Sequence, residues 1–230
     1  MNTITLIALI APSVIVAITF HEAAHGFVAF RLGDQTAFKR GRLSLNPLKH
    51  IDPFGTILLP AALLLLNVGF VFGYAKPVPV NPNALGNPKR DMVLVAAAGP
   101  AMNLLLACVS FLLIFPVELL SPGAGRLALF ALQASIAVNL TLAIFNMLPL
   151  PPLDGGKVAV GLLPDVLAKP LASVGRYGFL ILILVMFIAP VIAKRSGTSF
   201  DAFDWLIGRP VSAVMGLVDH AAGNRTNPSP

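Results

Sequence analysis

Charged side chains are scarce in this chain: 11% of its 230 residues are Asp, Glu, Lys or Arg, whereas 57% are hydrophobic. About a quarter of the residues of a typical soluble domain are charged, so this composition excludes an ordinary soluble protein and indicates an integral membrane protein. The net charge of +6 arises from basic residues spread over the connecting loops, a distribution typical of membrane topology. We therefore expect contact with the lipid bilayer and no binding of nucleic acid.

The chain has a single cysteine, Cys108, which excludes a disulfide framework. Because Cys108 lies in an apolar run, we expect it to be a small buried residue. The N-terminus lacks the basic residues of a secretory signal, since Met1-Asn2-Thr3 carries no Lys or Arg. The apolar run that follows is therefore expected to remain as a membrane helix rather than to be removed.

Long apolar runs dominate the sequence instead. A short one, Ile57–Phe72, is interrupted by Pro60. The sequence predicts an all-α integral membrane protein, a polytopic helix bundle of about four to six membrane segments, with a re-entrant or interfacial segment and a small membrane-associated β element. The runs long enough to span a bilayer as helices are Ile4–Phe30, Met92–Phe115, Leu127–Leu148 and Tyr177–Ile192.

Basic residues predict which side of the membrane each connection faces, because cytoplasmic loops are enriched in Lys and Arg. The loop after the first span carries five of them, so we expect it in the cytoplasm and the N-terminus outside. The connection before Met92 is also basic, and both connections are cytoplasmic only if Ile57–Phe72 re-enters or lies in the interface. The next loop holds Arg126 alone and is expected outside. The pair Lys194 and Arg195 does not fit this scheme, because the scheme places it outside as well.

The first apolar run ends in His21-Glu22-Ala23-Ala24-His25. Ionisable side chains are costly within a bilayer and usually serve a function there. Residues four apart share one face of a helix, so both imidazoles can bind one metal ion, while Glu22 projects about 100° away and is free to act as a base. This pattern is the zinc metalloprotease signature. The alternative, a polar patch paired inside a helix bundle, is less favoured in a chain with so few charges.

A catalytic zinc site needs a third protein ligand and an open position. Asp154 is the candidate, in a segment that begins at Asn146 and in which prolines break the helix and glycines allow close backbone approach. An ordinary Asp-Gly turn is the alternative. Asp154 follows the third span and reaches the side of His21 and His25 only if Ile57–Phe72 does not cross the membrane. The charge pattern and the metal site thus require the same topology.

In their order along the chain, these motifs resemble the site-2 protease family, the intramembrane zinc metalloproteases of peptidase family M50. The resemblance extends over about residues 15–180 and is specific, because the metal-binding motif is followed downstream by the Asn…Pro…Leu-Asp-Gly segment. PDZ and CBS modules have no room here, so the chain resembles a compact form. The further matching segments are Gly41–Pro47, Gly73–Pro82 and Ala98–Asn103.

The resemblance implies a role for each residue of the site. His21, His25 and Asp154 would hold one Zn²⁺ ion per chain, and Glu22 would act as the catalytic base. Asn146 would be a second catalytic residue, placing a polar group near the scissile carbonyl. A helix-end cap or an interhelical hydrogen bond is the alternative role for Asn146.

A transmembrane substrate hides its peptide bonds in a helix, so it must be held extended before attack. The Pro-punctuated segment Lys76–Pro82 suits this task, because it can present an edge for β-augmentation. A rigid Pro-rich linker is the alternative, and the family resemblance favours the edge. The substrate-binding residues that we predict are Lys76, Val78, Val80 and Asn81.

Other small or polar residues receive structural interpretations. Gly99, Ala101 and Asn103 are expected to allow close helix packing, with Asn103 hydrogen-bonding across to a neighbouring helix. His50 and His220 have no partner at ligand spacing. We interpret them as ordinary loop and tail residues.

The chain is predicted to divide into a protease core, residues 1–195, and a C-terminal region, residues 196–230. The apolar residues of Phe200–Ile207 recur at helical spacing with Trp205 beside them, which predicts an interfacial helix with an aromatic anchor. Gly223–Pro230 is expected to be a flexible tail.

Together these features predict zinc-dependent cleavage of transmembrane protein substrates near the cytoplasmic face of a membrane, most simply the prokaryotic plasma (inner) membrane. Two alternatives stay open. A divalent-metal transporter also places His, Glu and Asp in spanning helices, but it requires a polar pathway to both sides. A non-catalytic membrane protein could keep the same fold to bind partners. The sequence leaves the oligomeric state open.

Overall fold

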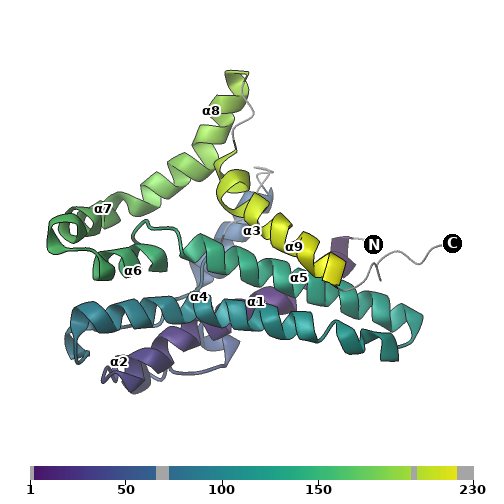
Figure 1. The fold of residues 1–230 in the computed structure, drawn as a ribbon, viewed down its shortest axis with the longest axis horizontal. Coiled ribbons are helices and arrows are strands. Elements are labelled where there is room, and N and C mark those ends of the chain that lie inside the picture. The colour runs from purple at the N-terminus through teal and green to yellow at the C-terminus, as the bar shows by residue number, and fades with distance from the viewer. Residues whose placement is uncertain (1–2, 66–72, 198–200, 222–230) are drawn as a thin grey trace.

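The computed structural model describes residues 3–65, 73–197 and 201–221. Helices account for most of these residues (Figure 1). Four helical stretches are long and apolar enough to cross a membrane, which confirms the four predicted spans. They are Thr5–Arg31, Pro88–Val117, Pro122–Asn146 and Asp165–Arg195.

Three long helices form the centre of the molecule: α1 (Thr3–Arg31), α4 (Pro88–Leu112) and α5 (Pro122–Asn146). Helix α4 packs against both of the others, and α1 also contacts α5. The start of α4 is fixed by Asn87, whose side chain accepts a hydrogen bond from the Arg90 N–H, as expected of an N-cap residue. This arrangement places residues of all three helices beside one another in the bundle interior.

The remaining helices cover the bundle and extend from it. Helix α6 (Asp154–Leu162) packs against α4. Helix α7 (Asp165–Ile183) continues through the π-helical turn Leu184–Ile188 into α8 (Ala189–Arg195), and this long helix leads away from the bundle (Figure 1). Helix α9 (Arg209–Ala221) then runs back along α5.

Two short α-helices lie in the described part of the connection between α1 and α4. Helix α2 (Thr36–Lys39) follows α1 directly, and a helical turn at Pro53–Leu58 leads into α3 (Leu59–Leu65). The apolar segment Ile57–Phe72 is therefore helical up to Leu65, and residues 66–72 lie outside the described residues.

The predicted β element does not appear among residues 3–65, 73–197 and 201–221, to which no strand is assigned. Lys76–Asn81 lies outside any helix and forms no ladder in those ranges. Its hydrogen bonds run instead to single groups of the protein, such as the Glu22 carboxylate and the Asp34 carboxylate.

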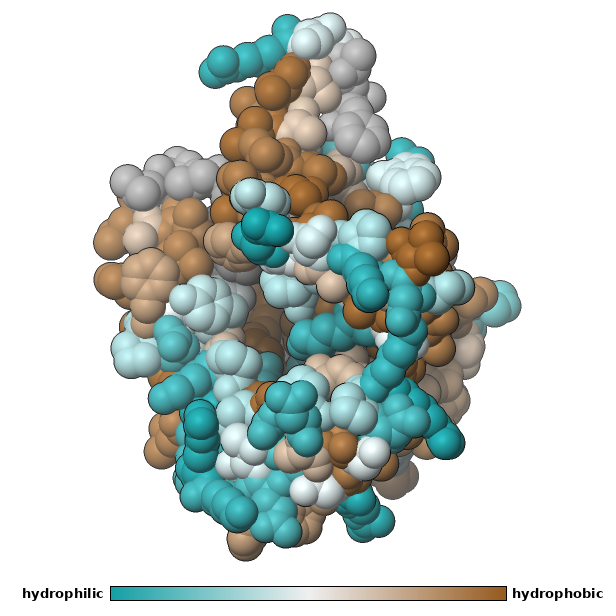
Figure 2. Space-filling view, turned by 90° about the vertical axis from the view of Figure 1, so that its left-hand side faces the viewer, coloured by the Kyte–Doolittle hydropathy of each residue, from teal (hydrophilic) through white to brown (hydrophobic). Residues whose placement is uncertain are grey.

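Many large apolar side chains of the spans are exposed on their outer surface, as expected of helices that contact lipid. Brown, hydrophobic residues dominate the upper part of Figure 2. Cys108 belongs to this outer surface and is exposed, so the prediction of a buried cysteine was wrong. In a membrane protein an apolar run contacts lipid as well as other helices, and apolarity alone does not predict burial.

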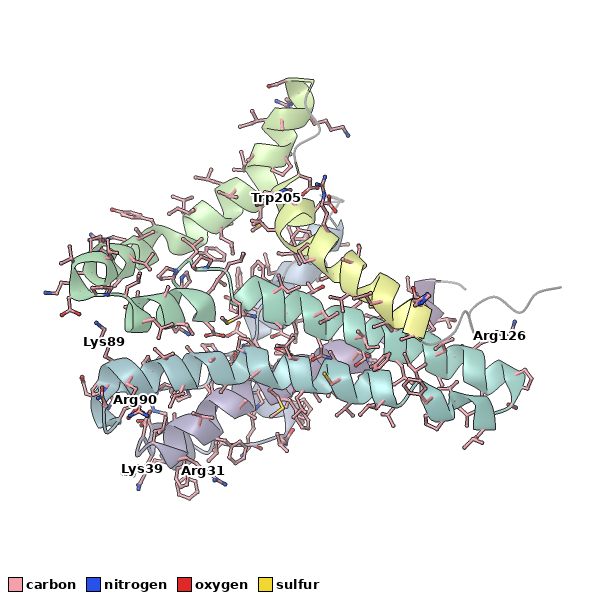
Figure 3. All side chains as sticks on the ribbon, viewed as in Figure 1. Arg31, Lys39, Lys89, Arg90, Arg126 and Trp205 are labelled. Atoms are coloured by element: carbon pink, nitrogen blue, oxygen red, sulfur yellow. The ribbon has the colours of Figure 1, made fainter. Side chains whose placement is uncertain are left out.

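Basic side chains gather at one end of the bundle. Arg31, Lys39, Lys89 and Arg90 lie together there, whereas Arg126 lies at the opposite end (Figure 3). Figure 2 looks onto the basic end, which is polar in its lower part and hollowed near its centre. The two basic connections therefore share one end of the bundle, the arrangement that the sequence predicted for them.

The predicted helix over Phe200–Ile207 is helical from Ala202 onwards, and Phe200 lies outside the described residues. Trp205 is exposed on the turn that leads into α9 (Figure 3). Ile207 is buried against α7 residues such as Leu182. The segment thus packs one apolar face on the core and exposes its aromatic ring. The predicted flexible tail, residues 223–230, also lies outside the described residues.

Candidate metal centre and active site

One turn of α1 and the first residue of α6 bring three potential metal ligands together. The Nε2 atoms of His21 and His25 lie 3.1 Å apart. The Oδ2 of Asp154 lies 3.2 Å from the first and 3.1 Å from the second. All three side chains are buried. The three residues predicted as ligands are thus assembled in one place from two distant parts of the sequence.

The geometry of this group suits a zinc ion. Zinc bonds of about 2.0–2.1 Å in a tetrahedral site place neighbouring ligand atoms about 3.3 Å apart, close to the observed sides of 3.1–3.2 Å. Three such acceptor atoms repel one another in a buried site unless a cation or a proton lies between them. Two imidazoles and a carboxylate with a fourth position open are also the donor set of catalytic zinc sites. The residues therefore fit the metal.

The other ring nitrogen of each histidine is held by a second residue. The Nδ1 of His25 lies 2.7 Å from the Val95 carbonyl oxygen, and the Nδ1 of His21 lies 2.6 Å from the Oδ1 of Asn103. Both partners belong to α4, so the predicted cross-helix bond of Asn103 is confirmed. Such partners fix ring orientation at metal sites and turn the Nε2 atoms toward the ion.

The Asp154 carboxylate has a second partner that sequence reasoning missed. Lys157, one turn further along α6, donates from Nζ to the Asp154 Oδ1 at 2.9 Å and leaves Oδ2 toward the histidines. Burial alone would raise the pKa of the Asp154 carboxyl, but the adjoining His21 and His25 side chains outweigh it and, with the Lys157 charge, hold that pKa well below its usual range. The i, i+3 spacing of Asp and Lys at a helix start is the signal that could have revealed this pair.

Glycines allow the metal ligands to come this close to neighbouring backbone. A Cβ atom on Gly99 of α4 would fall on the Nε2 of His25 and within 2.6 Å of the His21 Cε1. The predicted role of Gly99 in close helix packing is therefore confirmed. A Cβ atom on Gly155 would fall on the Met147 carbonyl oxygen, and one on Gly156 would meet the backbone of the preceding Pro-rich loop. No larger residue fits these positions without displacement of the site.

A cavity of about 480 Å³ opens beside the metal ligands. His21 and Glu22 line it from α1, and Asn146 lines it from the end of α5. Asn146 also donates from Nδ2 to the Leu142 carbonyl oxygen one turn earlier in α5, at 3.0 Å, while it borders the cavity. The apolar part of the lining comes from four parts of the chain: Ile18, Leu142, Phe145, Pro152, Leu153, Phe179 and Leu182.

Glu22 is hydrogen-bonded by the extended segment that passes beside α1. Its Oε2 accepts from the backbone N–H of Val78 at 2.7 Å. Val78 is itself buried, between Pro77 and Pro79, which have no N–H to donate. The bond orients the carboxylate at the edge of the cavity and leaves its other oxygen free of this contact.

The other residues predicted to bind substrate direct their backbone toward the protein itself. The Lys76 N–H donates to the His50 carbonyl oxygen at 2.9 Å, and the Asn81 N–H donates to the Asp34 Oδ2 at 2.6 Å. Val80 packs against an apolar cluster. The part of this connection that lines the cavity lies earlier in the chain, at Gly73, Tyr74 and Ala75.

Comparison with known proteins shows the family to which the chain belongs. The model of peptidase family M50 matches residues 121–189, which include Asn146 and Asp154. The Bacillus subtilis protein named "Putative zinc metalloprotease YwhC" is 42% identical over 184 residues, which cover 78% of this chain and 80% of that protein. The chain belongs to peptidase family M50.

More distant M50 relatives are found in mycobacteria. A protein of Mycobacterium tuberculosis and one of Mycolicibacterium smegmatis, both named "Putative zinc metalloprotease Rip2", are 30% and 31% identical. These matches cover 84% and 78% of this chain and 70% and 66% of the relatives. No solved structure matches this M50 chain.

Membership of family M50 makes the chain a metallopeptidase, a hydrolase of peptide bonds. The four apolar helices make it an integral membrane protein. The names of its relatives support zinc as the metal, and the buried group of His21, His25 and Asp154 is suited to hold it.

Proposed function

We propose that this M50 peptidase is an intramembrane endopeptidase that cleaves transmembrane segments of other proteins. The observation that carries the proposal is the shared cavity of about 480 Å³, in which His21 and Glu22 lie among apolar side chains of membrane-spanning helices. A cavity of this composition accepts an apolar peptide segment and places it beside the metal ligands.

The residues of the site have distinct roles in this proposal. One zinc ion held by His21, His25 and Asp154 would supply Lewis-acid activation of water and of the scissile carbonyl. Glu22 takes the proton of the attacking water and passes it to the leaving amine. The amide of Asn146 has a second N–H besides the one bound to Leu142. This N–H donates to the carbonyl oxygen as negative charge develops on it.

The extended segment beside α1 has two roles in the proposal. Gly73–Ala75, which lines the cavity, contacts the substrate backbone. The Val78 N–H holds Glu22 in place, so Val78 contributes through its backbone rather than its side chain. Lys76, Val80 and Asn81 shape this segment and contact only the flanks of the substrate.

The proposal is tested in liposomes that hold the full chain together with a panel of fluorescent transmembrane peptides. We expect cleavage that stops when zinc is chelated and returns when zinc is added, and no movement of zinc across the bilayer. Zinc flux that depends on His21, without cleavage, would show a transporter. Retained zinc without cleavage of any peptide would favour a non-catalytic binding protein.

A test of the Glu22 contact uses two substitutions at one position. Val78→Pro removes the N–H that donates to Glu22, whereas Val78→Ala removes side-chain atoms and keeps the N–H. We expect Val78→Pro to lower kcat about tenfold, because a hydrogen bond to a charged group is worth roughly 1.5–3 kcal/mol. Val78→Ala should reduce kcat far less. Equal losses in both variants, measured at equal zinc content, would show that the side chain rather than the N–H matters.

We further propose that the basic end of the bundle faces the cytoplasm, because Lys and Arg are enriched in cytoplasmic loops. Single cysteines at Lys39 and Arg126, in a Cys108→Ser background, test this orientation with a maleimide that does not cross membranes. We expect labelling at position 126 in intact cells and at position 39 only after lysis. The opposite pattern would place the metal site toward the outer face.

A further inference from the structure

A chain of buried polar side chains extends from the metal site into the bundle. The Nδ1 of His21 lies 2.6 Å from the Asn103 Oδ1, and the Asn103 Nδ2 donates to the Asn139 Oδ1 at 2.9 Å. The Asn139 Nδ2 in turn donates to the Ser135 carbonyl oxygen at 2.9 Å. Asn103 is 0% exposed and Asn139 1% exposed. Two fully buried amides in spanning helices are costly unless each is bonded and useful.

Backbone carbonyl groups determine which atom donates and which accepts in each of these hydrogen bonds. A backbone carbonyl only accepts hydrogen bonds, so the amide of Asn139 must turn its NH₂ group to Ser135 and its oxygen to Asn103. Asn103 must then turn its NH₂ group toward Asn139. The same orientation satisfies the Ala17 carbonyl oxygen, to which the Asn103 Nδ2 donates at 3.2 Å. Both amides are thus oriented by carbonyl groups of α1 and α5.

This direction determines which nitrogen of His21 carries the proton. The oxygen of Asn103 faces the His21 Nδ1, and an amide oxygen only accepts, so Nδ1 must be protonated. The Nε2 of a neutral His21 is then unprotonated and directed at the metal site. Nδ1 of His25 must be protonated as well, because it lies directly against the Val95 carbonyl oxygen, which only accepts.

We propose that Asn139 is a positioning residue that, together with the Ala17 carbonyl oxygen, holds the Asn103 amide with its oxygen toward His21 and thereby raises the zinc affinity of the site. Among the described residues Asn139 does not line the cavity, and its bond to Asn103 of α4 links it to His21. The inference rests on the proposed metal site, since it needs His21 as a ligand. It explains why an apolar stretch of α5 carries an amide in its middle.

The first test is the zinc affinity of variants at position 139, measured by competition with a chelator. Asn139→Leu has no acceptor for Asn103, and we expect it to bind zinc about tenfold more weakly, the lower end of the range for partners of metal ligands. Asn139→Gln keeps a neutral amide with an oxygen that can accept from Asn103, and it should lose less affinity than Asn139→Leu. Gln133→Leu is the control. It also replaces an amide of α5 by leucine, but at a residue that bonds to Asp219 of α9.

The second test reads the tautomer directly and does not depend on activity. Labelling with ¹⁵N-histidine marks only four residues, and the shifts of the ring nitrogens show which one is protonated. In the zinc-free protein at alkaline pH we expect a protonated Nδ1 at His21 in wild type. In Asn139→Leu we expect a larger share of the tautomer protonated at Nε2, because only the Ala17 carbonyl oxygen still orients Asn103. If the variant fails to fold, the wild-type spectrum still shows which nitrogen of His21 is protonated.

Distinct outcomes separate this inference from the proposed function. A wild-type His21 protonated at Nε2, or an Asn139→Leu variant with wild-type affinity and tautomer, would overturn the inference. A wild-type protein that binds no zinc would overturn the proposed function. The protonated nitrogen of His21, compared between wild type and Asn139→Leu, would still test the role of Asn139.

Discussion

Replacement of Glu22 by glutamine is expected to lower peptide cleavage by about 10²- to 10⁴-fold, the usual contribution of a general base. Glutamine keeps the size of the side chain and an oxygen that accepts from the Val78 N–H, but it cannot take a proton from water. The ligand atoms of His21, His25 and Asp154 are not altered, so zinc content should not change. Cleavage of a transmembrane peptide and zinc per chain are measured side by side.

The contrast with Glu22→Asp sharpens this test. Aspartate keeps a carboxylate but shortens the side chain by one methylene, so we expect an intermediate rate with wild-type zinc content. A Glu22→Gln variant that cleaves at the wild-type rate would show that another group accepts the proton. A variant that loses zinc together with activity would show that Glu22 supports the metal rather than the chemistry.

Gly99→Ala is expected to lower zinc affinity by about 100-fold, the upper end of the range for residues that support metal ligands. The added Cβ atom would fall on the Nε2 of His25 and within 2.6 Å of the His21 ring. The helices must therefore separate or the two rings must rotate out of the site. In either case the ligand triangle of 3.1–3.2 Å sides is lost. Competition with a chelator gives the affinity.

A matched control for Gly99→Ala is available on the same helix. Ala101→Val also enlarges a small residue of α4, but Ala101 is exposed, so zinc affinity should not change. An unchanged affinity in Gly99→Ala would mean that α4 does not approach the histidines as closely as the structure shows. Losses of similar size in both variants would indicate a general effect of larger side chains on the packing of α4.

The metal ligands were predictable because their signals are local. His21, Glu22 and His25 lie within two turns of one helix, and helix periodicity alone places the two imidazoles together. Asp154 lies far from them in the sequence. It follows a span, however, and the topology predicted from the loop charges places it at the same end of the bundle as the histidines. The four spans were likewise predictable, because a bilayer requires long apolar runs.

What the sequence did not reveal depends on pairs of residues far apart in the chain. The bond between Glu22 and Val78 joins positions 56 residues apart. No periodicity encodes such a contact. Asn139 lies in a run read only as a span, and its role emerges from the bond to Asn103 on another helix.

The contacts of the extended segment Lys76–Pro82 were also not predictable from the sequence. Its Pro and Val pattern suggested an edge strand, but the N–H of Lys76 is taken by His50 and that of Asn81 by Asp34. The cavity is lined by Gly73–Ala75 instead. Burial was also unpredictable where lipid replaces water, as the exposed Cys108 shows.

We propose that peptide bonds are hydrolysed inside the membrane, at the zinc site. The most direct measurement maps the cleaved bond by mass spectrometry in a transmembrane peptide reconstituted with the full chain in liposomes. We expect a cut within the apolar segment of the peptide that depends on zinc and is absent in Glu22→Gln. Cuts confined to the water-exposed flanks of the peptide, or cleavage that persists without zinc, would contradict it.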